Sequence, residues 1–123
     1  MHTAARCLHV LVVDDEPLIR WSIAETLGAA GHRVTEAQDA ASALQALVDA
    51  PDPDLVLLDF RLPDSSDLGL LAKIRQVAPA AKVIMMTAFG TPDVTAGALK
   101  LGASKVLNKP FNMHDLEGVV RSL

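Results

Sequence analysis

Short apolar runs alternate along the chain with segments that repeat apolar residues at helical spacing. The runs are too short for helices and consist mainly of Val, Leu, Ile and Met, which is typical of strands buried on both faces of a parallel sheet. The pattern predicts five strands, at residues 8–13, 33–37, 55–58, 82–86 and 106–107.

Five helices are expected, one after each strand, and two of them carry clear end signals. Pro17 suits the first turn of a helix, with Asp15 or Glu16 as the cap. Asn112 is expected to cap the last helix, with Phe111 and Leu116 as a hydrophobic staple. The stripes expected to face the core are Ile19, Ile23 and Leu27; Ala40, Leu44, Leu47 and Val48; Leu70, Leu71 and Ile74; Val94, Ala98 and Leu101; and Leu116, Val119, Val120 and Leu123.

Five repeats of strand and helix predict an α/β fold, a doubly wound five-stranded parallel sheet with helices on both faces. A dinucleotide-binding Rossmann unit would carry a glycine-rich turn after the first strand. The turn here is Asp14-Asp15-Glu16-Pro17, which repels phosphate unless a cation intervenes. The flavodoxin-like order 2-1-3-4-5 therefore fits better, with its ligand crevice between the first and third strands.

Polar residues follow four of the predicted strands: Asp14 and Asp15, Asp59, Thr87, and Lys109 after Asn108. Because parallel strands point the same way, these side chains are expected at one edge of the sheet. Three carboxylates there repel one another, and a hard divalent cation such as Mg²⁺ relieves that repulsion. A carboxylate is also a nucleophile toward phosphoryl groups. The edge therefore suits a metal ion and a phosphoryl group.

Taken singly, most of these residues have ordinary structural roles. Asp14 and Asp15 are common helix caps, Thr87 suits a turn, and Lys109 suits a solvated surface. For Asp59 a functional role is favoured, because a carboxylate seldom ends so apolar a strand without a purpose. Five such residues at equivalent strand ends favour one shared site.

The bulk properties narrow the function further. The chain has 123 residues, half of them apolar, which fits one domain; we expect a flexible leader at 1–7 and the domain at 8–123. A net charge of −4 without a basic stripe argues against direct nucleic-acid contact. The lone Cys7 suggests a reduced, cytoplasmic protein, and no apolar stretch is long enough to span a membrane.

Six short motifs occur in a fixed order: Val12-Val13-Asp14-Asp15-Glu16-Pro17, Leu57-Leu58-Asp59, Pro63, Met86-Thr87-Ala88, Gly102-Ala103 and Lys109-Pro110-Phe111. Their joint order and spacing resemble the receiver domain of bacterial two-component response regulators, over nearly the whole chain. The stretches 19–22 and 84–90 look most like receivers of the nitrogen-regulatory, enhancer-binding class.

The resemblance implies a role for each of the strand-end residues. Asp59 would be the phosphoryl acceptor. Asp14 and Asp15 would hold Mg²⁺ together with Asp59 and the backbone carbonyl of Arg61. The residues expected to contact the phosphoryl oxygens are Thr87 and Lys109, and the Lys109–Pro110 peptide bond is expected to be cis.

The resemblance also implies a signalling role. The partner would be a sensor histidine kinase that supplies the phosphoryl group, so the domain would not be a conventional turnover enzyme. Phosphorylation would change the surface of the fourth helix, fifth strand and fifth helix, most simply by homodimerisation. Control of transcription would then pass to an effector.

Two departures from the family pattern affect this picture. Many receivers carry Tyr or Phe where this chain has Val106, so we expect Val106 and Phe89 to repack instead. Many also carry a Gly in the loop that here reads Ser65-Ser66-Asp67.

Two other functions remain open. An aspartate-nucleophile phosphatase usually needs a second acid two residues after the nucleophile, where this chain has Arg61. A pseudo-receiver that only binds proteins is disfavoured by the intact polar set.

Overall fold

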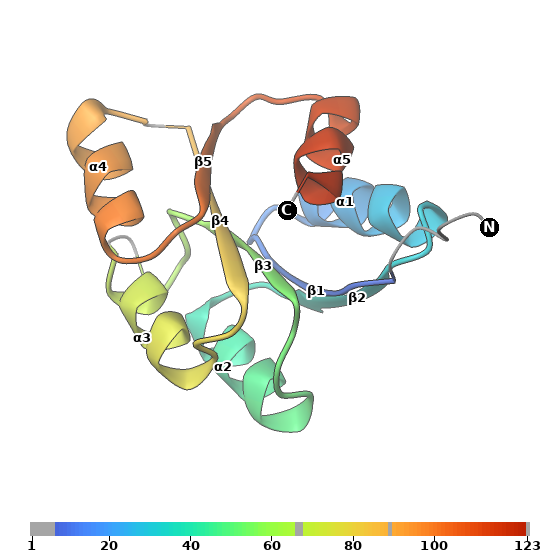
Figure 1. Ribbon diagram of the computed structural model, residues 1–123, viewed down its shortest axis with the longest axis horizontal. Helices are drawn as coiled ribbons and strands as arrows, with labels where there is room; N and C mark the ends of the chain where they lie inside the picture. Colours follow the sequence, from blue (N-terminus) through green and yellow to red (C-terminus); the bar gives the residue numbers. More distant parts are fainter. Residues whose placement is uncertain (1–6, 66–67, 89, 123) are drawn as a thin grey trace.

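One five-stranded sheet carries helices on both of its faces (Figure 1). The computed structural model describes residues 7–65, 68–88 and 90–122. The elements, in chain order, are β1 (His9–Val13), α1 (Pro17–Ala29), β2 (Arg33–Ala37), α2 (Ala40–Asp49), β3 (Leu55–Asp59), α3 (Gly69–Val77), β4 (Lys82–Thr87), α4 (Pro92–Lys100), β5 (Lys105–Asn108) and α5 (Met113–Arg121).

The strand order is β2-β1-β3-β4-β5, and every neighbouring pair is parallel. This order confirms the predicted flavodoxin-like topology. Val13 pairs with Leu58 in the register of β1 and β3, so the residues that follow them, Asp14 and Asp59, end up side by side. On the other side of β3, β4 and β5 end with Thr87 beside Asn108.

Two apolar layers lie on the two faces of the sheet because successive strand residues point to opposite sides. Leu11 and Val13 of β1 pack with α2, α3 and α4, while Val10 and Val12 pack with α1 and α5. Figure 1 shows α1 and α5 together on one side of the sheet and the other three helices on the opposite side. The central strands are thus packed on both faces, and this packing positions the residues at their ends.

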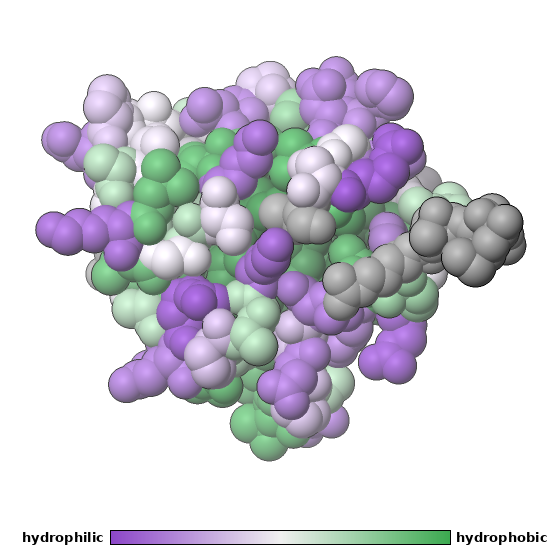
Figure 2. All heavy atoms as spheres, in the orientation of Figure 1, coloured by the Kyte–Doolittle hydropathy of each residue, from purple (hydrophilic) through white to green (hydrophobic). Residues whose placement is uncertain are grey.

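The predicted stripes are confirmed for most helices, but two of their members are wrong. Val48 is 71% exposed, because α2 faces the sheet with Ala43 and Leu47 and the next residue turns away. Figure 2 shows hydrophobic residues at the surface near the carboxyl-terminal end of α2. Leu101 is 41% exposed because α4 has already ended at Lys100.

Helix ends mostly follow the predicted signals. The side chain of Asn112 accepts the Asp115 N–H at 2.7 Å, so it caps α5, and Phe111 and Leu116 lie in the same apolar layer. At α1 the prediction is wrong in detail. Glu16 occupies the cap position without a side-chain cap bond, because its carboxylate contacts Lys109 Nζ instead, at 3.4 Å.

Several predictions fall on residues that the structure does not describe. These are the leader up to residue 6, the loop positions Ser66 and Asp67, Phe89 and Leu123. Within the described part of the chain, no helix is long and apolar enough to cross a membrane.

Candidate functional site

Two buried carboxylates lie at the ends of adjacent central strands. Asp14 follows β1 and is fully buried, while Asp59 is the last residue of β3 and is 6% exposed. The backbone N–H of Asp14 donates to the carbonyl of Ala37 at 3.1 Å, which ties the end of β1 to that of β2. Because unpaired buried charge is costly, the two carboxylates require a cation nearby.

The ammonium of Lys109, the residue that follows the edge strand β5, is such a cation. Its Nζ lies 2.9 Å from Asp14 Oδ2 and 3.1 Å from Asp59 Oδ2. A third carboxylate, Glu16, lies 3.4 Å from the same nitrogen. The backbone N–H of Lys109 donates to the Thr87 carbonyl at 2.8 Å, and the Lys109–Pro110 peptide bond is cis, as expected from the resemblance. Strand ends far apart in sequence therefore meet at one edge.

The burial of this cluster shifts its proton equilibria. Burial, reinforced by the charge of Asp14, raises the pKa of Asp59 from 3.8 to about 6, against the opposing effect of Lys109. Burial lowers the pKa of Lys109, but the hydrogen bond to Asp14 and the charge of Asp59 outweigh it, and the net change is upward. At neutral pH both groups are therefore mainly charged.

The carboxylates form an all-oxygen donor set. One oxygen from each of Asp14, Asp15, Glu16 and Asp59 lies within 4.8 Å of the others. Asp15 and Glu16 are exposed, whereas the other two are buried. Four carboxylates and a single ammonium, which contacts three of them, leave a negative excess, and hard cations such as Mg²⁺ prefer oxygen ligands. These residues therefore fit a divalent cation.

Glu16 is the member of this group that the sequence did not single out as a site residue. Its place directly after Asp14 and Asp15 was the available signal, but it reads equally well as a helix cap. The contact with Lys109 joins residues 93 positions apart, so local pattern does not reveal it.

The loop after β3 is held close to Asp59. The N–H of Phe60 donates to the Met86 carbonyl at 2.8 Å, and the N–H of Arg61 donates to Asp59 Oδ1 at 3.3 Å. Thr87 is buried at the end of β4, at the same edge of the sheet. The ligand role of the Arg61 carbonyl and the phosphoryl contact of Thr87 stay predictions.

The family model of the response regulator receiver domain matches residues 10–121. The chain belongs to this family. NtrC of Escherichia coli K12 is 38% identical over 111 residues, which is 90% of this chain and 24% of NtrC. PilR of Pseudomonas aeruginosa is 41% identical over 110 residues, with 89% and 24% covered.

A solved CheY-like receiver domain protein from Methanospirillum hungatei JF-1 has a TM-score of 0.88 and 30% identity, covering 95% of this chain and 93% of that one. The receiver fold is therefore matched over nearly the whole chain. The chain spans about a quarter of the length of the curated relatives NtrC and PilR. The similarity to NtrC supports the predicted resemblance to receivers of the nitrogen-regulatory class.

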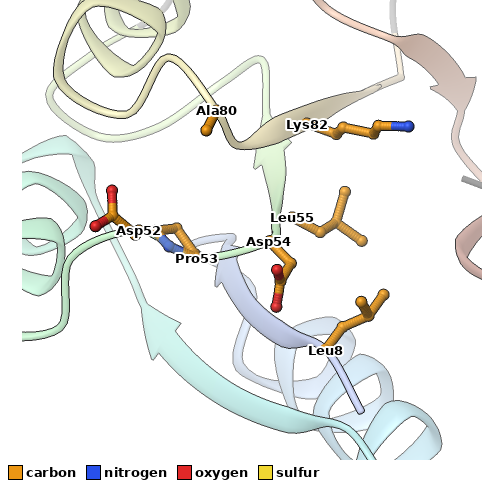
Figure 3. Close-up of a pocket in the computed structure, with 7 residues that line it drawn as sticks. All are labelled: Leu8, Asp52, Pro53, Asp54, Leu55, Ala80 and Lys82. Atoms are coloured by element: carbon orange, nitrogen blue, oxygen red, sulfur yellow. The ribbon is translucent and has the colours of Figure 1, made fainter. Parts of the chain in front are cut away.

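Two hollows flank the sheet of this receiver domain at opposite ends. One, of about 380 Å³, opens beside Lys109 and is lined by apolar side chains that include Ile19 and Phe111. The other, of about 300 Å³, lies at the amino ends of the strands, where Asp54 and Lys82 contribute to its wall (Figure 3). Asp54 already accepts the His9 N–H at 2.8 Å, so part of its bonding capacity serves the fold.

Proposed function

We propose that this receiver domain is a phosphorylation-activated switch in which Asp59 accepts a phosphoryl group. Mg²⁺ would be held by Asp14, Asp15, Asp59 and the backbone carbonyl of Arg61. The observation that carries the proposal is the position of Lys109, whose ammonium lies 2.9 and 3.1 Å from the two buried carboxylates. A cation held there is ready to neutralise a phosphoryl oxygen on Asp59.

The transfer is a substitution at phosphorus. An oxygen of the Asp59 carboxylate forms a bond to phosphorus, and the bond to the donor breaks, its electron pair leaving with the donor group. When bound, Mg²⁺ offsets the carboxylate charges and that of one phosphoryl oxygen. The ammonium of Lys109 and the hydroxyl of Thr87 serve the other two oxygens, so the protein mainly positions groups and offsets charge.

The physiological donor would be a phosphohistidine of a sensor histidine kinase. The domain takes part in one transfer per signalling event, so it is not a conventional turnover enzyme, although it catalyses its own phosphorylation and dephosphorylation. The phosphoryl group adds about 1.5–2 negative charges, which shift the balance between two surface arrangements.

The output would pass through α4, β5 and α5, most simply as homodimerisation. Leu99 of α4 is 48% exposed, which supports a partner on this side. NtrC is named a DNA-binding transcriptional regulator, and we extend control of transcription to the protein that contains this domain. The domain itself, with a net charge of −4, would make no direct nucleic-acid contact.

Val106 would transmit the change in place of the aromatic residue of many receivers. It is half-buried and packs against the apolar layer that contains Met85 and Ala98. When Thr87 moves toward the phosphoryl group, Val106 repacks under α4. Nuclear magnetic resonance spectra that stay unchanged across residues 91–106 on phosphorylation would contradict this route.

Intact-mass spectrometry with acetyl phosphate as donor tests the proposal. The wild type should gain one phosphoryl group in Mg²⁺ and none in EDTA, and Asp59→Asn should gain none. Asp54→Asn is the matched control, because it makes the same substitution at the other end of β3. An unlabelled wild type, or equal labelling of Asp59→Asn, would refute the proposal. Steady hydrolysis of phosphomonoesters over many turnovers would instead favour the phosphatase alternative.

A further inference from the structure

Helix α2 begins with backbone N–H groups bound by carboxylates from two separate segments. Asp39, the residue before the helix, accepts the Ser42 N–H at 2.7 Å. Asp64, from the loop after β3, accepts the Ala40 N–H at 2.8 Å and the Ala41 N–H at 3.1 Å, one with each oxygen. The first N–H groups of a helix lack partners within it and favour negative charge. Asp64 therefore binds the two N–H groups, those of Ala40 and Ala41, that the Asp39 side chain does not bind.

Asp64 sits at the tip of a tight turn in that loop. The N–H of Leu62 donates to the Ser65 carbonyl at 2.7 Å, and the N–H of Ser65 donates back to the Leu62 carbonyl at 3.2 Å. Pro63 occupies the turn position that favours proline. Leu62 is 6% exposed and packs in the apolar layer beneath α2 and α3. The turn is thus anchored at its base by Leu62 and at its tip by Asp64.

Arg61 lies between this turn and Phe60, whose backbone is hydrogen-bonded to β4. Upstream, the Phe60 N–H is bound to the Met86 carbonyl at 2.8 Å. Downstream, Leu62 begins the turn that Asp64 fixes to α2. The backbone of Arg61 is therefore held by contacts on both sides. Mg²⁺ demands near-ideal octahedral geometry, so a displaced carbonyl would bind it less well.

We propose that Asp64 is a positioning residue for the metal site: its two hydrogen bonds to the start of α2 hold in place the loop whose Arg61 carbonyl would bind the cation. This inference rests on the proposed function, in which that carbonyl is a ligand. Asp64 is not one of the four clustered carboxylates, Asp14, Asp15, Glu16 and Asp59. Removing its carboxylate weakens Mg²⁺ binding while every proposed ligand remains present.

The test compares Asp64→Ala with Asp39→Ala. Both variants remove a carboxylate that caps α2, but Asp39 belongs to the entry of the helix and not to the loop after β3. The readouts are the Tm in EDTA, the Mg²⁺ concentration that gives half of the Mg²⁺-induced change in the fluorescence of Trp21, the one tryptophan, and the Mg²⁺ dependence of Asp59 labelling by acetyl phosphate. The Tm in EDTA should fall by a few degrees in both.

Asp64→Ala is expected to raise the half-saturating Mg²⁺ concentration about fivefold, which corresponds to about 1 kcal/mol. The labelling rate at saturating Mg²⁺ should stay near that of the wild type, because the reacting groups are intact. Asp39→Ala should leave the half-saturating concentration unchanged. Asp64→Asn retains one carbonyl oxygen as acceptor and should recover part of the loss.

The failures are distinguishable. A wild type that shows neither a Mg²⁺-induced fluorescence change nor labelling overturns the proposed function, and this inference with it. A wild type that binds and is labelled, combined with unchanged Mg²⁺ dependence in Asp64→Ala, overturns the inference alone. An equal rise in Asp39→Ala has the same meaning, because the effect would then come from α2 and not from the loop. Should Asp64→Ala fail to fold, Asp64→Asn with wild-type Mg²⁺ dependence overturns it.

Discussion

Asp59 is predicted to make the metal-free protein less stable as the pH rises, and Asp59→Asn should remove this dependence. Burial, with the charge of Asp14, raises the pKa of Asp59 from 3.8 to about 6 in the folded protein. The unfolded chain keeps the ordinary value, so between about pH 4 and pH 6 the folded state binds more protons than the unfolded state. The contribution of Asp59 to the free energy of unfolding therefore falls as the pH rises through this window.

The size of the effect follows from the two pKa values. The difference between about 6 and 3.8 corresponds to about 3 kcal/mol, at about 1.4 kcal/mol for each pKa unit. Solvent at the edge of the site screens part of this, which leaves about 2 kcal/mol. Measured against the wild type, Asp59→Asn should gain about 2 kcal/mol in its free energy of unfolding between pH 4 and pH 7.

Urea unfolding in EDTA, followed by circular dichroism at a series of pH values, measures this difference. A constant offset from the substitution itself does not matter, because only the change with pH is used. Excess Mg²⁺ should reverse the trend for the wild type, since the cation binds the ionised carboxylate. A difference between the two proteins that stays constant from about pH 4 to pH 7 would refute the reasoning.

Two further predictions concern the charges around Asp59. Lys109→Ala leaves the buried carboxylates without their ammonium and should lower the free energy of unfolding in EDTA by about 3 kcal/mol, largely restored by Mg²⁺; urea unfolding with an equal loss in both conditions would contradict this. Glu16→Gln should raise the half-saturating Mg²⁺ concentration about twofold, because it removes an exposed carboxylate of the cluster. Its control is Glu25→Gln on α1, the helix that Glu16 precedes, which should match the wild type in the same Mg²⁺ titration.

Sequence pattern predicts the strands and their common edge well, for a physical reason. Burial on both faces leaves few polar residues in the central strands, so the change from Leu58 to Asp59 marks where a strand ends. Parallel packing then brings such ends together without any knowledge of side-chain contacts. Asp14, Asp59 and Lys109 were found in this way, although the contact between Asp14 and Lys109 spans 95 positions.

Contacts that depend on how loops pack were not predicted. The bonds from Asp64 to the start of α2 cross 24 and 23 positions, and nothing in the local sequence separates Asp64 from any loop aspartate. Successive side chains of an α-helix point in directions about 100° apart. The exposure of Val48 therefore depends on which face of α2 is turned toward the sheet. Apolar spacing alone fixes that rotation too loosely to assign the outermost residues of a stripe.

The most direct test of the account locates the phosphoryl group chemically. An aspartyl phosphate is an acyl phosphate, and borohydride reduces it to homoserine at the labelled position. After treatment with acetyl phosphate and Mg²⁺, peptide sequencing by mass spectrometry should find homoserine at residue 59, and none after treatment in EDTA. Homoserine at another aspartate, or at no position, would contradict the central claim.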